Sequence, residues 1–368
     1  MRHKTKLNWI EADRLIAANT EAVSAIQLCA EPLVSVCLIT YNHQKFVRRA
    51  VDSVLAQSTD FSFEVIIADD HSIDGTTDIA MEYQRRYPDR ISVLLARNNL
   101  GRHTGNGRLN VIRAVRACRG KYIAFLEGDD FWTDPRKLQM QAEFLESHSD
   151  YAGAFHDTAV LEADGAAGNP NHWWQDFRDR VDITLEDTIS RTSPFHTSSF
   201  FLRRENLSKL PLDYLRIASG DLAIFILSAA RGLLRRIPAS MSVYRKHDGG
   251  ITNTSNHWGW GGWIQKRFML RVLRKHLYPV GRERFDEAIK QYDDQLFSLW
   301  LRKKTIAERR ALLRGAWRNQ GRFLVVQLMV RSILFAAKQP MIALRRSVGR
   351  RLPDGIKRRL RLMVGSRA

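Results

Sequence analysis

The stretch GKYIAFLEGDD, residues 120–130, decides the fold of this chain. Its centre, Tyr122 to Leu126, is a continuous apolar run, which predicts a strand covered on both faces. Three acids then occupy three of the next four positions: Glu127, Asp129 and Asp130. Carboxylates crowded at a buried strand end repel one another, and a divalent cation relieves that repulsion. The stretch therefore predicts a sheet strand with a chemical site at its carboxyl end.

Three similar apolar runs precede this stretch, and segments with helical spacing of apolar residues separate them. The runs are Val34–Ile39, Phe63–Ala68 and Ile91–Leu95. Strands that alternate with helices indicate an α/β fold, a mainly parallel sheet with helices on both faces. Ligands of such sheets bind beyond the carboxyl ends of the strands, so the polar residues after each run are candidate site residues.

The chain is long enough, at 368 residues, for two domains, and its net charge of +19 is unevenly placed. Residues 256–368 hold 27 Lys and Arg against 7 Asp and Glu, whereas residues 1–255 hold 31 against 32. We expect an N-terminal helical extension at 1–31, an α/β domain at 32–255 and a basic, mainly helical C-terminal region at 256–368.

Redox and targeting signals favour a cytoplasmic protein. Cys29, Cys37 and Cys118 lack metal-ligand spacing and are too few for a disulfide scaffold. The N-terminus shows no charged-then-apolar signal pattern, and the best apolar run, Phe323–Ala337, is short and contains Arg331. We therefore expect a reducing compartment and no membrane span.

Two other strand ends also carry unusual polar groups. Thr40-Tyr41-Asn42-His43 follows the first run, and Asp69-Asp70-His71-Ser72 follows the second. Asp74-Gly75-Thr76, slightly further on, reads as a turn and helix cap. A turn does not require an acid at Asp69 or the three crowded acids after Leu126, so we interpret these carboxylates as site residues. Carboxylate oxygens shared with substrate phosphates suit Mg²⁺ or Mn²⁺.

The ordered set of motifs resembles family-2 glycosyltransferases of the GT-A fold. Five pieces carry the resemblance: residues 34–42, 68–76, 98–101, 120–130 and 244–247. The resemblance implies a Rossmann-like GT-A catalytic domain at 32–255 that acts as a hexosyl- or related transferase. A sugar would pass, with inversion, from a nucleotide-diphosphate-sugar donor to a hydroxyl of a glycan or lipid-linked glycan, as in polysaccharide biosynthesis.

The resemblance also implies which residues bind the donor and the metal. Asp129 and Asp130 would be the metal ligands of a DxD motif, with Mn²⁺ or Mg²⁺ as the cofactor. The first acid of that motif is Glu127 here, and its part in metal binding stays open. The implied nucleotide-sugar-binding residues are Thr40, Asn42, Asp69, Asp70, Asn99, Gly101, Asp129 and His247.

An inverting transfer needs a general base on the face opposite the leaving group. Asp221, directly after Ser219-Gly220, opens a predicted amphipathic helix, as the base of the family does. The alternative interpretation is that Asp221 only stabilises the N-terminus of that helix. Glu205 and Asp213 are the lesser candidates, because neither follows a glycine at a helix start.

Several residues are candidates for contact with the acceptor. Trp132 could stack on the acceptor sugar or belong to the core, and His156-Asp157 could line the acceptor pocket. A second set is interpreted as a hydrophobic anchor for the C-terminal helices, with a sugar platform as the alternative: Trp258, Trp260 and Trp263.

The basic C-terminal region is expected to attract a polyanion. An apolar face followed by a run of cations is typical of a helix at an anionic membrane surface, which would make the protein peripheral on the inner face of the cell membrane. The face is Leu324, Val325, Leu328, Met329, Ser332 and Ile333, and the cations are Arg345, Arg346, Arg350, Arg351, Lys357, Arg358, Arg359 and Arg361. A solvated tail is the alternative. Nucleic acid is not expected as a partner, because its recognition signatures are absent.

Two rival functions share such a sheet. A dinucleotide-binding oxidoreductase lacks support, because no G-x-G-x-x-G follows the first run. A non-catalytic nucleotide-sugar- or polyanion-binding module on the same fold is the remaining alternative. The intact acids Asp69, Asp129, Asp130 and Asp221 argue against it.

Overall fold

The computed structural model describes residues 8–23, 31–104, 107–169, 180–189, 193–250 and 260–302, with positions 310 and 314. The chain divides into two compact units, residues 1–291 and 292–368. Trp258, the side chain of Trp260 and the lipid-docking residues from Leu324 onward lie outside the described part of the chain. The domain boundaries after residues 31 and 255 stay predictions.

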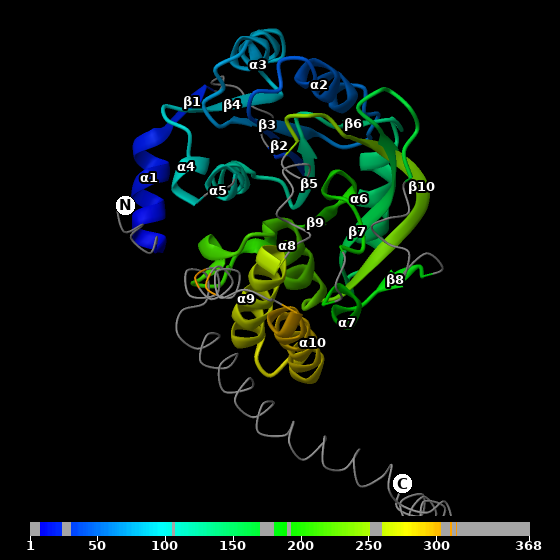
Figure 1. Ribbon diagram of the computed structural model, residues 1–368. Coiled ribbons are helices and arrows are strands. Elements are labelled where there is room, and N and C mark those ends of the chain that lie inside the picture. Colours follow the sequence, from blue (N-terminus) through cyan, green and yellow to red (C-terminus); the bar gives the residue numbers. More distant parts are fainter. Residues whose placement is uncertain are drawn as a thin grey trace, which may run out of the picture. The chain divides into compact units, whose positions relative to one another are not determined.

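Four parallel strands form the centre of a ten-stranded sheet (Figure 1). They are β2 (Val34–Thr40), β3 (Phe63–Asp69), β4 (Ile91–Ala96) and β5 (Tyr122–Glu127), arranged as β4-β3-β2-β5. Their β-branched and other apolar residues are almost wholly buried, as strands covered on both faces require. The predicted α/β fold with a mainly parallel centre is confirmed.

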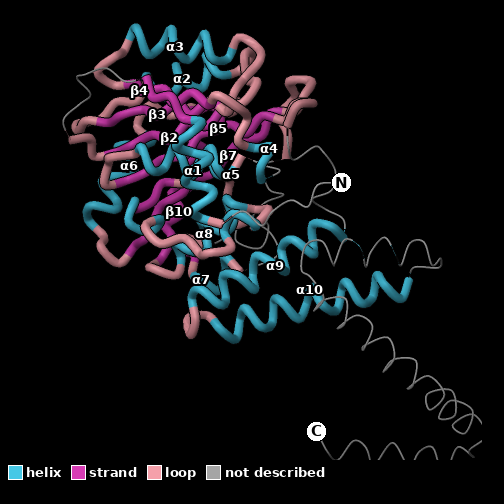
Figure 2. Tube along the Cα trace, turned by 90° about the vertical axis from the view of Figure 1, so that its left-hand side faces the viewer, coloured by secondary structure: helices cyan, strands magenta, loops and turns pink. Residues whose placement is uncertain are grey.

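Helices cover both faces of this centre (Figure 2). On one face α2 (Val47–Leu55), α3 (Thr76–Arg86) and α6 (Lys137–Ser147) share a hydrophobic core with the strands. On the other face α5 (Arg108–Ala117), which follows the short α4 (Gly101–Thr104), packs against β2 and β3. The loops at the carboxyl edge of the sheet are therefore held by elements from both layers.

The second half of the sheet is mixed and more extensive than predicted. β9 (Phe201–Arg203) pairs antiparallel with β5 and β7 (Tyr151–Leu161), and β7 pairs parallel with β10 (Leu233–Arg245). Two short strands, β6 (Phe131–Trp132) and β8 (Asp182–Ile183), pair antiparallel with β10. In the sequence only residues 240–245 of this segment have the pattern of a strand, so β10 begins seven residues earlier than that pattern predicts.

The remaining helices follow or connect these strands. They are α7 (Leu185–Thr188), η3 (Thr197–Ser199), η4 (Arg204–Leu207), η5 (Tyr214–Arg216), α8 (Gly220–Ala229), α9 (Trp260–Leu277) and α10 (Arg282–Arg302). α8 lies where the sequence predicts a helix beginning near Asp221, and its apolar side chains are buried.

The N-terminal segment is only partly helical. α1 (Trp9–Asn19) is a helix as expected, and the side chain of its N-cap, Asn8, accepts a hydrogen bond from the backbone of Glu11 at 2.8 Å. Thr20–Val23, however, form β1, an antiparallel edge strand on β4, where the sequence predicts continued helix. The segment before residue 32 therefore contributes a strand to the sheet.

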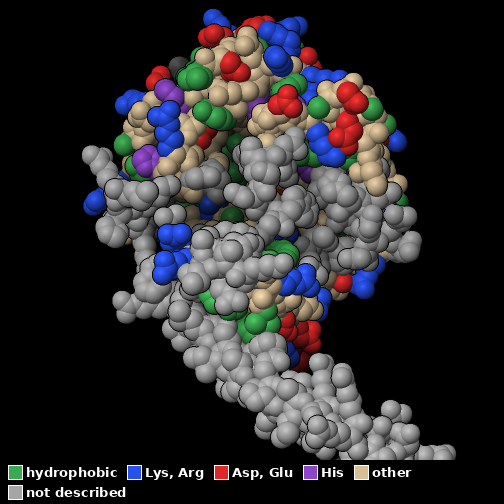
Figure 3. Space-filling model, in the orientation of Figure 1, with side chains coloured by type: hydrophobic (Ala, Val, Ile, Leu, Met, Phe, Trp, Pro, Cys, Tyr) green, Lys and Arg blue, Asp and Glu red, His purple; other side chains and the backbone are tan. Residues whose placement is uncertain are grey.

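The described helices show no candidate membrane span: none combines the necessary length with enough apolar residues. On the face drawn in Figure 3, Lys and Arg side chains are interspersed with Asp and Glu over the described surface. This agrees with the near balance of charge in residues 1–255.

Candidate active site

The carboxyl ends of β2, β3 and β5 meet at one edge of the sheet, where the sequence predicts the site. Thr40 pairs in register with Asp69, and Ile39 pairs with Glu127. Neighbouring strands lie about 4.8 Å apart, so the residues that follow these strands form one continuous surface.

Asp69 is buried at the end of β3 and has a fixed orientation. Its carboxylate accepts hydrogen bonds from the Ser72 backbone N–H at 3.1 Å, from the Ser72 hydroxyl, and from the Thr77 hydroxyl at 2.8 Å. Such a network holds a carboxylate in one rotamer. The side chain is thus preorganised at the position predicted for nucleobase contact, and that contact stays a prediction.

Asp70 connects the end of β3 to the loop after β4. Its carboxylate accepts hydrogen bonds from the backbone N–H groups of Leu100 at 2.7 Å and Gly101 at 3.0 Å, and the Asn99 amide donates to the Asp70 carbonyl at 2.9 Å. Burial raises the pKa of Asp70, against the effect of those two N–H groups. The structure therefore brings three predicted donor-site residues together, and it occupies both carboxylate oxygens of Asp70 in holding the loop.

The turn after β2 is tied to the turn after β3. Asn42 has φ of +54°, a left-handed conformation that Asn tolerates better than most residues. Its side-chain oxygen accepts a hydrogen bond from the Ile73 backbone at 2.9 Å. Thr40 is buried, and its hydroxyl has no hydrogen-bond partner among the described residues. A Cβ atom on Gly128 would lie 2.7 Å from that hydroxyl, so glycine allows this close approach.

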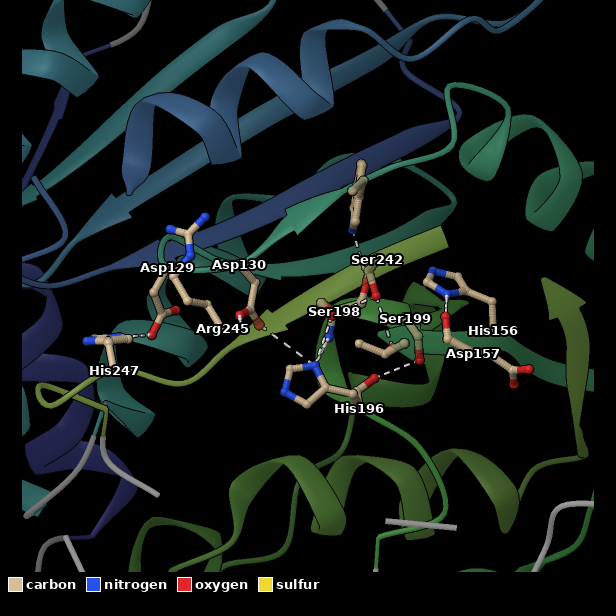
Figure 4. Close-up of polar contacts among 12 residues, drawn as sticks. Asp129, Asp130, His156, Asp157, His196, Ser198, Ser199, Ser242, Arg245 and His247 are labelled. Atoms are coloured by element: carbon tan, nitrogen blue, oxygen red, sulfur yellow. Dashed lines mark hydrogen bonds and ion pairs between the residues drawn. The ribbon is translucent and has the colours of Figure 1, made fainter. Parts of the chain in front are cut away.

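The acidic segment, residues 127–130, directs its two aspartates to different partners (Figure 4). Asp129 Oδ2 lies 3.0 Å from His247 Nε2 and 3.7 Å from His43 Nε2. Asp130 accepts a hydrogen bond from the Arg245 backbone N–H at 2.9 Å, and its other oxygen lies 3.7 Å from His196 Nδ1. The end of β10 is thereby fastened to the acidic segment.

The two aspartates also differ electrostatically. Burial opposes ionisation of Asp129, but the hydrogen bond with His247 and the nearby His43 outweigh it and hold the pKa of Asp129 below its ordinary value. Burial, followed by the charges of Asp129 and Glu127, raises the pKa of Asp130 well above its ordinary value. Asp129 is therefore the better ligand for a cation at neutral pH.

The carboxyl group of Glu127 has a strongly raised pKa. Burial first, then the charges of Asp129 and Asp221, raise its pKa to about 8. Its Oε2 atom is buried and has no hydrogen-bond partner among the described residues. Glu127 is therefore largely protonated at neutral pH.

Two groups of side chains at this edge could each hold a metal ion. The first group is His43, Asp129 and His247, and the second is Glu127, Asp130 and His196; within each, the ligand atoms lie within 4.8 Å of one another. The sequence predicts Asp129 and Asp130 as the ligands of one site. The structure gives them different partners, because Gly128 and Asp129 form a turn that is closed by a hydrogen bond from the Asp130 backbone N–H to the Glu127 carbonyl at 3.0 Å.

His43 and His196 are site residues that the sequence analysis does not single out. The only available signal for His43 is its place in the polar segment after β2, next to Asn42. His196 is the first residue of a strand that the sequence predicts to end at Leu202, whereas the structure has η3 after His196 and β9 only from Phe201. Its approach to Asp130 depends on the pairing of β9 with β5. Neither contact has a local sequence pattern.

Asp221 lies in the first turn of α8 and its side chain is exposed. Its charge contributes to the raised pKa of Glu127, so the start of α8 faces the acidic segment. The Tyr214 hydroxyl donates to the Gly220 carbonyl at 3.3 Å and so supports this helix start. An exposed carboxylate beside a buried acidic site can accept a proton from a bound hydroxyl.

The two lesser base candidates lie elsewhere. Arg204, the residue before Glu205, donates its backbone N–H to Lys121 at 2.9 Å, at the amino end of β5. Glu205 therefore lies at the edge opposite the acidic segment. Asp213 forms an ion pair with Arg216 at 2.7 Å. Neither arrangement resembles that of Asp221.

The structure does not support the predicted acceptor contacts of Trp132 and His156-Asp157. Trp132 is buried, its indole N–H donates to the Ser198 carbonyl at 2.9 Å, and Lys137 Nζ lies 4.0 Å from the ring centre. His156 is wholly buried within β7 rather than after it, and Asp157 pairs with Arg236 at 2.8 Å. The ring of Trp132 is core, and no face of it is open to a sugar.

The fold and its acid-lined edge define a GT-A glycosyltransferase scaffold, and a solved structure shows the same fold. Staphylococcus aureus TarS 1–349, in complex with UDP-GlcNAc, superimposes with a TM-score of 0.57 at 18% identity, covering 77% of this chain and 79% of TarS. Residues 35–210 match the model of glycosyl transferase family 2.

Curated relatives share the same part of the chain. The uncharacterized protein Rv1520 of Mycobacterium tuberculosis is 34% identical over 224 residues, which is 60% of this chain and 61% of Rv1520. Bacillus subtilis TuaG, named as a teichuronic acid biosynthesis glycosyltransferase, is 36% identical over 135 residues, covering 37% of this chain and 50% of TuaG. The chain thus spans between half and two thirds of the length of these relatives.

Proposed function

We propose that this protein transfers a sugar, with inversion, from a nucleoside-diphosphate sugar to a hydroxyl group of a glycan or lipid-linked glycan. One observation carries the proposal: Asp69, the acidic segment with its histidines, and the start of α8 with Asp221 converge on one edge of the sheet. The UDP-GlcNAc complex of TarS supports a nucleotide-sugar donor, and the name of TuaG supports a polysaccharide acceptor.

The residues present fit a divalent cation. The Oε2 atom of Glu127 is buried without a partner among the described residues, as expected of a group that awaits a ligand. The set His43, Asp129 and His247 combines a carboxylate with two imidazoles, which suits Mn²⁺ better than Mg²⁺, an ion that prefers oxygen. Such a cation, when bound, stabilises the negative charge that develops on a departing diphosphate.

The side chains of this chain would perform the rest of the reaction. Asp69 would orient the nucleobase, and Asp221 would accept the proton of the acceptor hydroxyl as its oxygen bonds to the anomeric carbon. The bond from that carbon to the diphosphate oxygen breaks in the same step, and the nucleoside diphosphate leaves. A protonated Glu127 limits the negative charge that the diphosphate meets at this edge.

A thermal-shift screen tests the proposal directly. UDP-, GDP-, dTDP- and CMP-sugars are added to the full chain with Mn²⁺ and, separately, with EDTA. We expect a UDP-, GDP- or dTDP-sugar to raise the midpoint of unfolding with Mn²⁺ only, because a ligand that binds the folded state stabilises it. A shift with the CMP-sugar alone, which carries a single phosphate, would contradict the proposed diphosphate donor. If none of them shifts the midpoint in either condition, the proposed donor class is wrong.

A further inference from the structure

Two arginines lie against one aromatic ring beside the acidic segment. The guanidinium carbon of Arg49, in α2, is 3.6 Å from the ring centre of Phe131, and that of Arg245, at the end of β10, is 5.3 Å from the same centre. Arg245 is also 4.6 Å from the ring centre of Phe46. Phe131 follows Asp130 directly, so the pair borders the proposed site.

The two guanidinium groups have no hydrogen bond or ion pair with another described residue, in contrast to the neighbouring Arg48. Arg48 forms an ion pair with Glu82 at 2.9 Å. Burial lowers the pKa of Arg245, and the nearby charge of Arg49 lowers it further, against the opposing effect of the charges of Asp130 and Asp129. The fold thus holds two like charges close together, and the two carboxylates offset their repulsion only in part, so a further anion that joins the arginines is favourable.

Stacking on a ring prepares a guanidinium for anion binding. The ring covers one face of the planar group and leaves the N–H donors at its edge available. One guanidinium fork satisfies the two oxygens of a carboxylate, whereas a phosphate has further oxygens for a second fork. Two adjacent stacked arginines therefore favour phosphate.

The position of the pair favours the acceptor rather than the nucleotide. The predicted nucleotide residues Asp69, Asp70 and Asn99 belong to β3 and the loop after β4, on one side of the acidic segment, although His247, also predicted to bind the donor, packs on Phe46 beside Arg245. Phe131 lies in β6, which pairs with β10 and belongs to the opposite half of the sheet. A ligand seated on the arginine pair would thus approach the acidic segment from the side away from the nucleobase.

We propose that Arg49 and Arg245 form an anion site that binds a phosphate group of the acceptor. This inference rests on the proposed transfer function and specifies its acceptor as a phosphate-bearing glycan or lipid-linked glycan. The donor diphosphate is the other possible source of the same chemistry, and the experiment separates the two.

The experiment uses the full chain and the variants Arg49→Gln, Arg245→Gln and their combination, with Arg48→Gln as the matched control. In one arm, inorganic phosphate is titrated calorimetrically into metal-free protein at constant ionic strength. We expect one saturable phosphate site in the parent and in Arg48→Gln, weakened at least tenfold in each Arg49 and Arg245 variant. In the other arm, UDP and GDP are titrated with Mn²⁺, and every variant should bind within about twofold of the parent, because the pair does not contact the nucleotide.

Three results would overturn the inference. They are the absence of a saturable phosphate site in the parent, equal weakening in Arg48→Gln, and loss of nucleotide affinity in the Arg49 and Arg245 variants, which would give the pair to the donor diphosphate. Arg49→Lys keeps the charge but lacks the planar fork of donors, so it should restore only part of the phosphate affinity. If a glutamine variant does not fold, the phosphate affinity of Arg49→Lys replaces it as the test. Failure of the parent to bind any nucleotide would instead contradict the proposed function.

Discussion

Two buried glutamates at opposite edges of the same sheet show how differently a fold can treat one side chain. Glu64, near the start of β3, accepts hydrogen bonds from the Ser35 hydroxyl at 2.6 Å and from the backbone and side chain of Arg119 at 2.8 Å each. Glu127, at the end of β5, has a buried oxygen without a partner among the described residues and a pKa raised to about 8.

The difference separates a structural acid from a functional one. Four donor–acceptor and ionic contacts neutralise Glu64, so it fastens the amino edge of the sheet. Glu127 lies among acids that repel it, and its hydrogen bond with Thr197 compensates for burial and repulsion only in part. Stability has been given up at the carboxyl edge, where a ligand can restore it.

The largest expected effect concerns catalysis at the carboxyl edge. Asp221→Asn removes the proton acceptor and nearly preserves its shape, so sugar transfer at saturating donor should fall by roughly 10²–10⁴. Nucleotide affinity, measured by calorimetry, should stay within about twofold. Glu205→Gln, at the amino edge, is the matched control and should transfer at close to the parent rate.

Two outcomes would change this assignment. A fall of less than about tenfold in Asp221→Asn would place the base elsewhere. Collapse of nucleotide binding in the same variant would show that Asp221 is needed to build the site, and the rate would then carry no information on proton transfer.

The next effect concerns stability at the amino edge. Glu64→Gln leaves the donors of Arg119 and Ser35 without their charged acceptor, and we expect the free energy of unfolding to fall by about 2–3 kcal/mol. Glu127→Gln should instead raise it at pH 7, because the folded glutamate keeps a proton that the unfolded chain releases, and glutamine removes this cost. Urea unfolding of both variants measures this difference, and an equal loss of the free energy of unfolding in the two variants would contradict it.

A smaller effect concerns the pH dependence of stability in the metal-free protein. Folded Glu127 keeps its proton up to about pH 8, whereas the unfolded chain releases it near the ordinary value of 4.5. The unfolded state therefore binds fewer protons between these pH values, and stability falls as pH rises, by at most about 1.4 kcal/mol per pH unit. Urea unfolding at pH 5, 6.5 and 8 with EDTA should show a shallower decline for Glu127→Gln than for the parent. An identical decline would mean that the glutamate ionises normally.

The sequence predicts the central strands well, because their signal is local. The ends of β2, β3, β4 and β5 agree with the predicted apolar runs to within about one residue. A strand that ends before His156 is predicted, but its continuation to Leu161 is not, because the sequence YAGAFHDTAVL mixes small and polar residues with apolar ones. The buried His156 of β7 is accommodated by neighbours distant in the sequence.

The site is predictable only in part, for the same reason. Asp69, Asp129 and Asp221 are identified from the strand-end and helix-start patterns around them. The partners of the acidic segment are not, since Asp129 and His247 are 118 residues apart and Arg245 and Asp130 are 115 apart. The sequence also does not reveal whether a single aromatic ring is buried or exposed. Trp132 is for that reason interpreted from the sequence as a candidate for acceptor contact, although it belongs to the core.

Metal-dependent nucleotide binding tests the central claim that the carboxyl edge is the active site. The measurement is calorimetric titration of the parent, Asp129→Asn and the amino-edge control Glu146→Gln with UDP and GDP, each with Mn²⁺ and with EDTA. Asp129 contacts His247 and belongs to the candidate metal group that also includes His43, whereas Glu146 forms an ion pair with Lys121 at the amino edge of the sheet. We predict Mn²⁺-dependent binding in the parent and in Glu146→Gln, and its loss in a folded Asp129→Asn. Undiminished Mn²⁺-dependent affinity in Asp129→Asn would contradict the account.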